Sequence, residues 1–249
     1  MASTYGRCAW VQPSAQRAPV LQQAEPEGGR PPRQVRPGLW LFAPNRDSQG
    51  GSSWLLERQE GDLLIDCPAI SQANLAFLAA RGGRGTIVLT GRTGHGRCRR
   101  IQAIGGWPVL VQEQEAYLLP TVPGVVSFGS EHTVAPGIRA LWTPGPTPGA
   151  CVLHAQGPWG DLLFCGRLLL PVGPGALAPL RVAGCFHWPR QLASIEKLRN
   201  WLPAGSPATV ASGGGLGVLR GEVLVEGGAA LLAALPLADL AGVDGRDRL

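Results

Sequence analysis

Pairs of short apolar runs, each pair followed by a helical run, constrain the fold of this chain most strongly. In the N-terminal half, the runs at 52–59 and 62–68 are separated by a short polar turn and predict a β-hairpin. The segment 70–83 follows with helical spacing, because Ser71 can cap its start and Gly82 can end it. The first unit is therefore strand, strand, helix.

The same order recurs in the C-terminal half. Strands predicted at 151–157 and 161–170 flank a Gly-Pro-Trp-Gly-Asp turn. A helix is predicted over 189–202, where Leu192 and Ile195 begin an apolar series at helical spacing. Strand pairs followed by helices, twice over, predict an αββα sandwich, a mixed α/β fold in which helices flank two packed mixed β-sheets. The remaining predicted elements are strands in 85–90, 108–113, 140–145 and 207–217 and helices in 97–106 and 225–237.

Composition supports a globular domain. The 249 residues are 45% hydrophobic and only 16% charged, so there is ample apolar material for a core. Residues 1–32 are rich in Gln, Pro, Ala and Gly and are expected to form a flexible leader. The folded domain is expected to cover 33–238, with a frayed tail over 239–249.

Arginine carries nearly all of the positive charge. The formal net charge is +5, and Lys197 is the sole lysine. Arginine forks bind phosphate and carboxylate groups, so an anionic partner is conceivable, although arginine replacing lysine on an ordinary surface explains the charge more simply. No aromatic-basic interleaving or basic stripe predicts specific nucleic-acid binding. A Walker P-loop and the Gly-x-Ser-x-Gly elbow of serine hydrolases are also missing from the sequence.

The cysteines favour a reducing compartment. Six of them are widely spaced, and none forms a Cys-x-x-Cys pair, so neither a zinc ribbon nor a redox dithiol is predicted. Free buried thiols in the cytoplasm are the expectation. The alternative is organelle targeting, since the first 24 residues contain Arg7 and Arg17 but no acidic residue. A secretory signal and an apolar run long enough to cross a bilayer are both missing, so no membrane association is predicted.

Four segments, in this order, resemble motifs of the metallo-β-lactamase fold superfamily. The run 63–68 is similar to its strand that ends in an aspartate, and 89–96 stands where the superfamily has a Thr-His-x-His-x-Asp-His turn. The segment 142–154, Trp-Thr-Pro-Gly-Pro-Thr-Pro-Gly and onward, resembles its Thr-Pro-Gly-His-Thr-Pro-Gly motif, and 162–170 resembles its Phe-x-Gly-Asp-x-Leu motif. A weaker match at 210–217 corresponds to a Gly-His-Gly turn. The resemblance implies an αββα sandwich and, in ordinary members, hydrolysis by a zinc-activated water.

The resemblance also implies which positions would hold zinc. Carried over residue by residue, the histidine and aspartate ligand positions are occupied here by Gly91, Thr93, His95, Gly96, Pro146, Arg167 and Gly214. None of these positions keeps its expected ligand: His95 stands for an aspartate, and Arg167 stands for the aspartate that bridges the metals. Glycine and proline offer no side-chain donor, and a guanidinium repels a cation. The sequence therefore predicts a degenerate member without a metal or other cofactor.

Two functions follow from this comparison. The first is a non-catalytic binding or assembly module whose former active-site cleft is lined by Asp66, Arg92, His95 and Arg167, with a small anion or an acidic peptide as its partner.

The alternative is a metal-dependent hydrolase of thioesters, phosphoesters or lactones. It would use one zinc or iron ion in a rebuilt site made from His95, His154 or His187 with Asp66, Cys67 or Cys165. Each of these histidines also has a purely structural interpretation: hydrogen bonding in a sheet for His154, and packing beside aromatic neighbours for His187. His132 is expected to be exposed.

Overall fold

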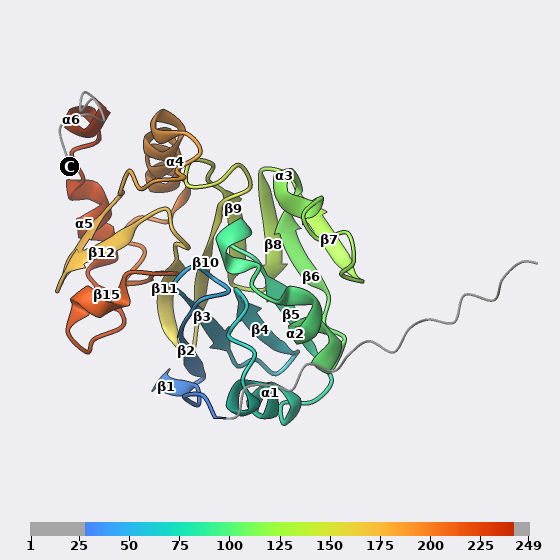
Figure 1. The fold of residues 1–249 in the computed structure, drawn as a ribbon. Coiled ribbons are helices and arrows are strands. Elements are labelled where there is room, and N and C mark those ends of the chain that lie inside the picture. Colours follow the sequence, from blue (N-terminus) through green and yellow to red (C-terminus); the bar gives the residue numbers. More distant parts are fainter. Residues whose placement is uncertain (1–27, 242–249) are drawn as a thin grey trace, which may run out of the picture.

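Two large β-sheets pack face to face in the computed structural model, which describes residues 28–241 (Figure 1). The first sheet has the order β1-β2-β3-β4-β5-β6-β7. Its strands are β1 Arg33–Arg36, β2 Leu39–Asn45, β3 Gly51–Leu56, β4 Asp62–Ile65, β5 Gly85–Val88, β6 Val109–Gln112 and β7 Val125–Phe128. Strands β1 to β4 pair antiparallel, and β4 to β7 pair parallel. The carboxyl ends of these parallel strands therefore meet at one edge of the sandwich.

The second sheet has the order β15-β14-β11-β10-β9-β8. Its strands are β8 Glu131–Ala135, β9 Ile138–Trp142, β10 Cys151–Gly157, β11 Gly160–Phe164, β14 Thr209–Ala211 and β15 Val225–Glu226. The β11–β14 pairing is parallel and the other pairings are antiparallel. A separate two-stranded sheet is formed by β12 Leu170–Gly173 and β13 Ala176–Ala178.

Helices cover the outer faces of both sheets (Figure 1). They are α1 Gln72–Ala79, the 3₁₀ helix η1 Arg92–Gly94, α2 Cys98–Gly105, α3 Glu113–Ala116, α4 Trp188–Trp201, the 3₁₀ helix η2 Leu216–Leu219, α5 Gly228–Ala234 and α6 Leu237–Ala241. Helices α1 and α2 lie on the first sheet, and α4 and α5 lie on the second. None of the helices in the described range 28–241 is long and apolar enough to cross a membrane.

Alternating side chains on the strands separate two hydrophobic clusters. On β3, Trp54 points between the sheets and packs against Phe164 of the second sheet, with ring centroids 6.1 Å apart. Its neighbour Leu55 points outward into the cluster that includes Leu78 of α1 and Ile101 of α2. The period-two pattern of the strands thus buries both faces of the first sheet.

The predicted αββα architecture is confirmed, and so are the hairpin of β3 and β4 and the first helix. Ser71 caps α1, because its Oγ accepts a hydrogen bond from the Asn74 backbone N–H at 3.3 Å. Within the described residues, regular structure begins with β1 at Arg33, while residues 1–27 of the predicted leader lie outside the described residues.

Helix α6 crosses the predicted boundary between the domain and the tail. Proline cannot continue a helix, and Pro236 separates α5 from the short helix α6. Helix α6 ends at Ala241, three residues past 238. The rest of the predicted tail, 242–249, lies outside the described residues.

Candidate functional site

Asp66 anchors the edge where the parallel strands end. It follows β4 with φ at 60°, and its backbone N–H donates to Val88 O at 2.9 Å. Its carboxylate accepts the Thr90 backbone N–H at 2.8 Å and the Thr90 hydroxyl at 2.6 Å. Burial raises the pKa of Asp66 to about 6, against the opposing effects of the two Thr90 hydrogen bonds and the positive charge of Arg167. Asp66 therefore fixes the start of the loop after β5.

The glycine-rich turn after β5 is packed too tightly for larger side chains. A Cβ at Gly91 would lie 3.0 Å from Thr147 Oγ1, and one at Gly94 would overlap the Asp66 carboxylate. Gly96 has φ at +45°, and a Cβ there would lie 3.2 Å from Cys67 Cβ. A side chain at Gly91 or Gly96 would thus require its neighbour to shift by a few tenths of an ångström, and the positive φ of Gly96 disfavours one further.

Arg167 lies at the end of β11, where the resemblance placed the bridging aspartate. Its Nη2 donates to Ser48 O at 2.9 Å and to Gln49 O at 2.8 Å, and the side chain is half-buried. These backbone carbonyls hold the guanidinium, which forms no ion pair with Asp66 although the two charges still interact. A Cβ at Gly214 would lie 3.7 Å from Arg167 Cζ, so these two expected ligand positions are adjacent.

His95 faces a carboxylate that sequence reasoning missed. Its Nε2 lies 3.8 Å from Oε2 of Glu115, and the two side chains are 12% and 1% exposed. Glu115 Oε1 accepts the Gly149 backbone N–H at 3.0 Å, whereas its Oε2 and His95 Nε2 have no hydrogen-bond partner among the described residues. Burial lowers the pKa of His95, and the nearby Glu115 opposes this effect. The position of Glu115 could have been predicted, because α3 directly follows β6 and therefore lies where the parallel strands end.

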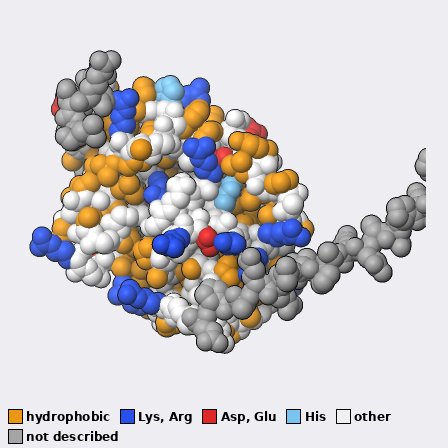
Figure 2. All heavy atoms as spheres, viewed as in Figure 1, with side chains coloured by type: hydrophobic (Ala, Val, Ile, Leu, Met, Phe, Trp, Pro, Cys, Tyr) orange, Lys and Arg blue, Asp and Glu red, His pale blue; other side chains and the backbone are white. Residues whose placement is uncertain are grey.

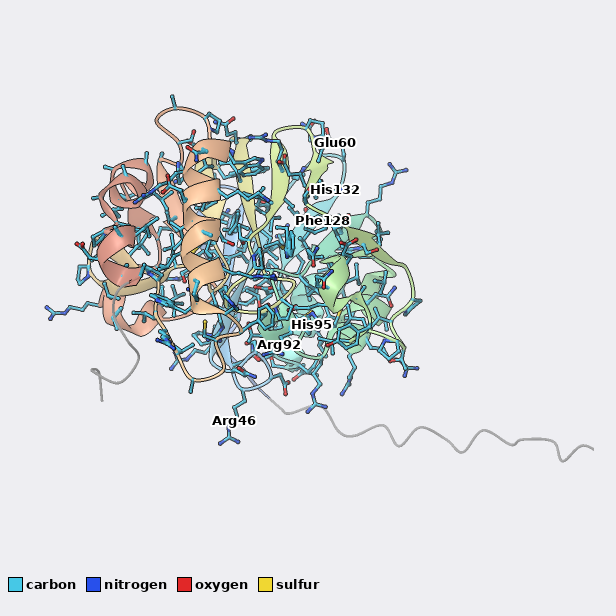
Figure 3. The ribbon with its side chains drawn as sticks, turned by 90° about the horizontal axis from the view of Figure 1, so that it is seen from above. Arg46, Glu60, Arg92, His95, Phe128 and His132 are labelled. Atoms are coloured by element: carbon cyan, nitrogen blue, oxygen red, sulfur yellow. The ribbon has the colours of Figure 1, made fainter. Side chains whose placement is uncertain are left out.

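Arg92 is exposed on η1. Figure 3 shows it beside His95, while Arg46 projects away from the molecule. Figure 2 shows that positive side chains predominate over negative ones on the face turned to the viewer. The predicted cleft residues Asp66, His95 and Arg167 thus gather at the loops that follow the strands, with Arg92 at the surface.

The remaining histidines do not join His95. His154 on β10 lies with its Nε2 2.7 Å from Asp161 Oδ1, and the His187 ring caps α4 by accepting the Arg190 N–H at 3.1 Å. His132 is exposed on β8 and packs against Phe128, with ring centroids 5.9 Å apart.

Neither a family model nor a curated protein matches the sequence. Solved structures do match. The DIM-1 metallo-β-lactamase, in a structure exposed to ceftazidime, is 16% identical, with 88% of this chain and 100% of that chain covered at a TM-score of 0.63. A Cronobacter sakazakii metallo-β-lactamase with a HARLDQ motif is 19% identical, with 85% and 97% covered at 0.55. An archaeal metallo-β-lactamase superfamily protein from Sulfolobus tokodaii is 15% identical, with 83% and 87% covered at 0.55.

The chain has the metallo-β-lactamase fold. At these identities the likeness concerns the fold alone, so the chemistry of the cleft must be argued from its own side chains.

Those side chains do not fit the zinc centre that the metallo-β-lactamase resemblance implies. Zinc takes three or four N, S or O donors at about 2.0–2.3 Å. Within residues 28–241, no group of three or more His, Cys, Asp and Glu side chains is placed to hold a metal ion. The guanidinium of Arg167 also puts a positive charge at one of the expected ligand positions.

Proposed function

We propose that this chain is a binding module that takes a small anion in the former active-site cleft and does not carry out metal-dependent hydrolysis. The anion is a phosphate or a carboxylate, since planar guanidinium groups bind both well.

The placement of Arg167 is the observation that carries this proposal. Two backbone carbonyl oxygens, of Ser48 and Gln49, hold its Nη2, so the guanidinium is fixed by neutral acceptors, and Asp66 interacts with its charge without forming an ion pair. Among the described residues it forms no ion pair with a carboxylate. A half-buried cation that is already oriented loses little side-chain entropy when an anion binds.

Groups on the other loops that follow the strands are proposed to belong to the same site. Arg92 adds a second guanidinium at the surface, and His95 lies beside it. Thr147 Oγ1 is buried without a hydrogen-bond partner among the described residues, next to Gly91. The site thus combines fixed positive charge with polar groups whose hydrogen-bonding capacity is unused.

Thermal unfolding with added inorganic phosphate or acetate tests the proposal, with ionic strength held constant by sodium chloride because exposed charges are screened by salt. We expect one of the two anions to raise the Tm of the wild-type chain, since a ligand present at 100 times its Kd adds about 2.7 kcal/mol to the free energy of unfolding. Arg167→Gln should abolish the rise. Arg92→Gln should reduce it.

Arg84→Gln is the matched control, because Arg84 is exposed at the start of β5, at the opposite edge of the sheet. It should keep the full rise in Tm. An equal response of the Arg167→Gln and Arg84→Gln variants, or no response of the wild-type chain to either anion, would overturn the proposal.

Elemental analysis of the purified chain, dialysed without chelator, tests the other half of the proposal. We expect less than about a tenth of an equivalent of zinc or iron, because zinc needs at least three good donors. Close to one equivalent would favour the metal-dependent hydrolase instead.

A further inference from the structure

The segment 180–186, which precedes α4, exposes several apolar side chains. Leu180, Val182 and Phe186 are 38%, 50% and 46% exposed. Single apolar side chains on a surface are ordinary, but a group of them in one short segment is typical of a surface that binds another molecule. We call 180–186 the wall segment.

Hydrogen bonds hold the wall segment against the loop between β9 and β10. The Phe186 N–H donates to Pro146 O at 3.2 Å, and the His187 N–H donates to Gly145 O at 3.0 Å. The Cys185 thiol also donates to Gly145 O, at 3.4 Å. Pro146 stands at one of the expected ligand positions, so the wall segment borders the former active-site cleft.

A buried amide connects the wall segment to the residue that follows Arg167. Gln191 near the start of α4 is 1% exposed. Its Nε2 donates to Leu168 O at 3.0 Å, and its Oε1 accepts the Cys185 thiol at 3.4 Å. Because both ends of this amide are bonded and buried, the wall segment is held at the same edge of the sandwich as Arg167.

The charge around the wall segment is positive. The sequence has no acidic residue between Asp161 and Glu196, and this stretch contains Arg167, Arg181 and Arg190. Arg181 is exposed and forms no ion pair among the described residues. Exposed apolar area next to unpaired positive charge is complementary to a surface that combines apolar side chains with carboxylates.

We propose that the wall segment docks an acidic peptide segment of a protein partner. Apolar side chains of the partner cover Leu180, Val182 and Phe186, and one of its carboxylates binds at Arg167. The second contact rests on the proposed function, whereas the first does not.

A peptide fits this surface better than the other anionic ligands. A free phosphate or carboxylate would use the guanidinium but leave the wall segment uncovered. A single-stranded nucleic acid binds mainly by stacking its bases on aromatic rings, and two of the three exposed apolar side chains here, Leu180 and Val182, are aliphatic. An acidic peptide with apolar side chains is complementary to both the charge and the apolar area.

Selection from a random peptide library displayed on phage tests the proposal, because such a library offers every side-chain chemistry at once. The bait is the folded full-length chain. We expect enrichment of peptides that combine aspartate or glutamate with leucine, isoleucine, valine or phenylalanine. The most enriched peptide is synthesised with a fluorescein label, and its Kd is measured by fluorescence anisotropy. Enrichment of peptides without acidic residues, or no enrichment over selection without the bait, would overturn the proposal.

Serine substitutions test the apolar contacts. Val182→Ser and Phe186→Ser should each raise the Kd of the selected peptide about tenfold, because each removes one apolar side chain from the interface. Val126→Ser is the matched control, since Val126 is 49% exposed on β7 of the first sheet, and it should leave the Kd unchanged. Far-ultraviolet circular dichroism checks that each variant folds. Equal Kd values for Val182→Ser and Val126→Ser would contradict the proposal.

The charge contact has its own variant. Arg181→Gln should raise the Kd, and added sodium chloride should raise it further in the wild-type chain, because exposed charges are screened by salt. Arg84→Gln, at the opposite edge of the sheet, should keep the wild-type Kd. A Kd that responds neither to salt nor to Arg181→Gln would exclude an acidic partner.

Sedimentation velocity and a fluorescein-labelled single-stranded DNA test the other occupants. We expect the wild-type chain to sediment as a monomer and to leave the anisotropy of the DNA unchanged. A dimer that Phe186→Ser dissociates would assign the wall segment to a second copy of the chain. DNA binding that Phe186→Ser weakens would assign it to a nucleic acid. Either result would overturn the proposal.

Arg167→Gln separates this inference from the proposed function. Peptide binding that is lost in Arg167→Gln but kept in Val182→Ser and Phe186→Ser would keep the anion site and defeat docking on the wall segment. Peptide binding that needs Val182 and Phe186 but not Arg167, together with no rise in Tm with phosphate or acetate, would defeat the proposed function while the acidic partner on the wall segment stands.

Discussion

Two histidine–carboxylate pairs lie at opposite ends of this sandwich, and they are built in opposite ways. At the far end of the second sheet, His154 Nε2 lies 2.7 Å from Asp161 Oδ1, and Asp161 Oδ2 accepts the Ser206 hydroxyl at 2.8 Å and the Ala208 N–H at 3.1 Å. At the cleft, His95 and Glu115 lie 3.8 Å apart, and neither facing atom has a hydrogen-bond partner among the described residues.

The difference distinguishes structural from functional polar groups. The far pair joins β10, β11 and the loop before β14, and His154 also packs edge-on against Trp201 of α4 with ring centroids 6.2 Å apart. Its polar atoms are satisfied, so it stabilises the fold. The cleft pair leaves hydrogen-bonding capacity unused, which costs stability unless a bound molecule uses it. The unpartnered atoms of the cleft pair support the proposed binding site at this edge.

The largest expected effect concerns Asp66, which belongs to the cleft. Its pKa in the folded chain is raised from 3.8 to about 6, so it contributes stability that is present below pH 3.8 and is lost as the pH rises through 6. Relative to Asp66→Asn, the wild-type chain should therefore lose up to about 3 kcal/mol of unfolding free energy between pH 4 and pH 7. Urea denaturation of both chains across this range measures the difference.

Asp161 in the far pair should contribute to the free energy of unfolding with the opposite pH dependence. Burial acts to raise the pKa of Asp161, but hydrogen bonds from Ser206 and His154 hold it below the ordinary value. Its contribution to stability is present above pH 3.8 and is lost as the pH falls further. A pH-independent difference between the wild-type chain and Asp66→Asn would contradict the contrast between the two ends.

The next effect is the loss of the far pair. Asp161→Ala removes the partner of His154, Ser206 and the Ala208 N–H together, and we expect a loss of about 2 kcal/mol, less than for a fully buried pair because Asp161 is partly exposed. Equilibrium urea unfolding at pH 7 measures it. Glu60→Ala is the matched control, since the Glu60 side chain is 71% exposed and pairs with Arg58 at 3.0 Å. Equal losses in the two variants would mean that the far network does not stabilise the fold.

The sequence predicted the architecture and the structural role of His154 better than it predicted the contacts at the cleft. His154 was interpreted as a hydrogen-bonded sheet histidine, and its bond to Asp161 confirms this. Strand alternation and the Ser71 cap likewise predicted the hairpin and α1. These features depend on neighbours within a few residues along the chain or on adjacent strands, where period and spacing carry the information.

The cleft depends on contacts that spacing does not encode. Glu115 lies on a helix of four residues, too short to show a period, and its partners His95 and Gly149 come from other loops. The Cys67 N–H reaches Gly94 O only because the turn 94–98 folds back onto the end of β4. The resemblance predicted which loops would form the site, but the contacts among their residues could be described only from the three-dimensional structure.

The smallest expected effect tests the cleft pair directly. Glu115→Gln keeps an oxygen that can accept the Gly149 N–H, and it places an amide N–H₂ group toward His95 Nε2, which can accept a hydrogen bond in its neutral form. A donor then faces an acceptor where two unpartnered atoms stood, so the free energy of unfolding should stay within about 1 kcal/mol of the wild-type value or rise. Glu115→Ala, which also deletes the bond to Gly149 and leaves a cavity, should be clearly less stable in the same urea experiment at pH 7. If Glu115→Gln were instead as destabilising as Asp161→Ala, the cleft pair would be a structural pair like the far one, and the distinction between the two ends of the sandwich would fail.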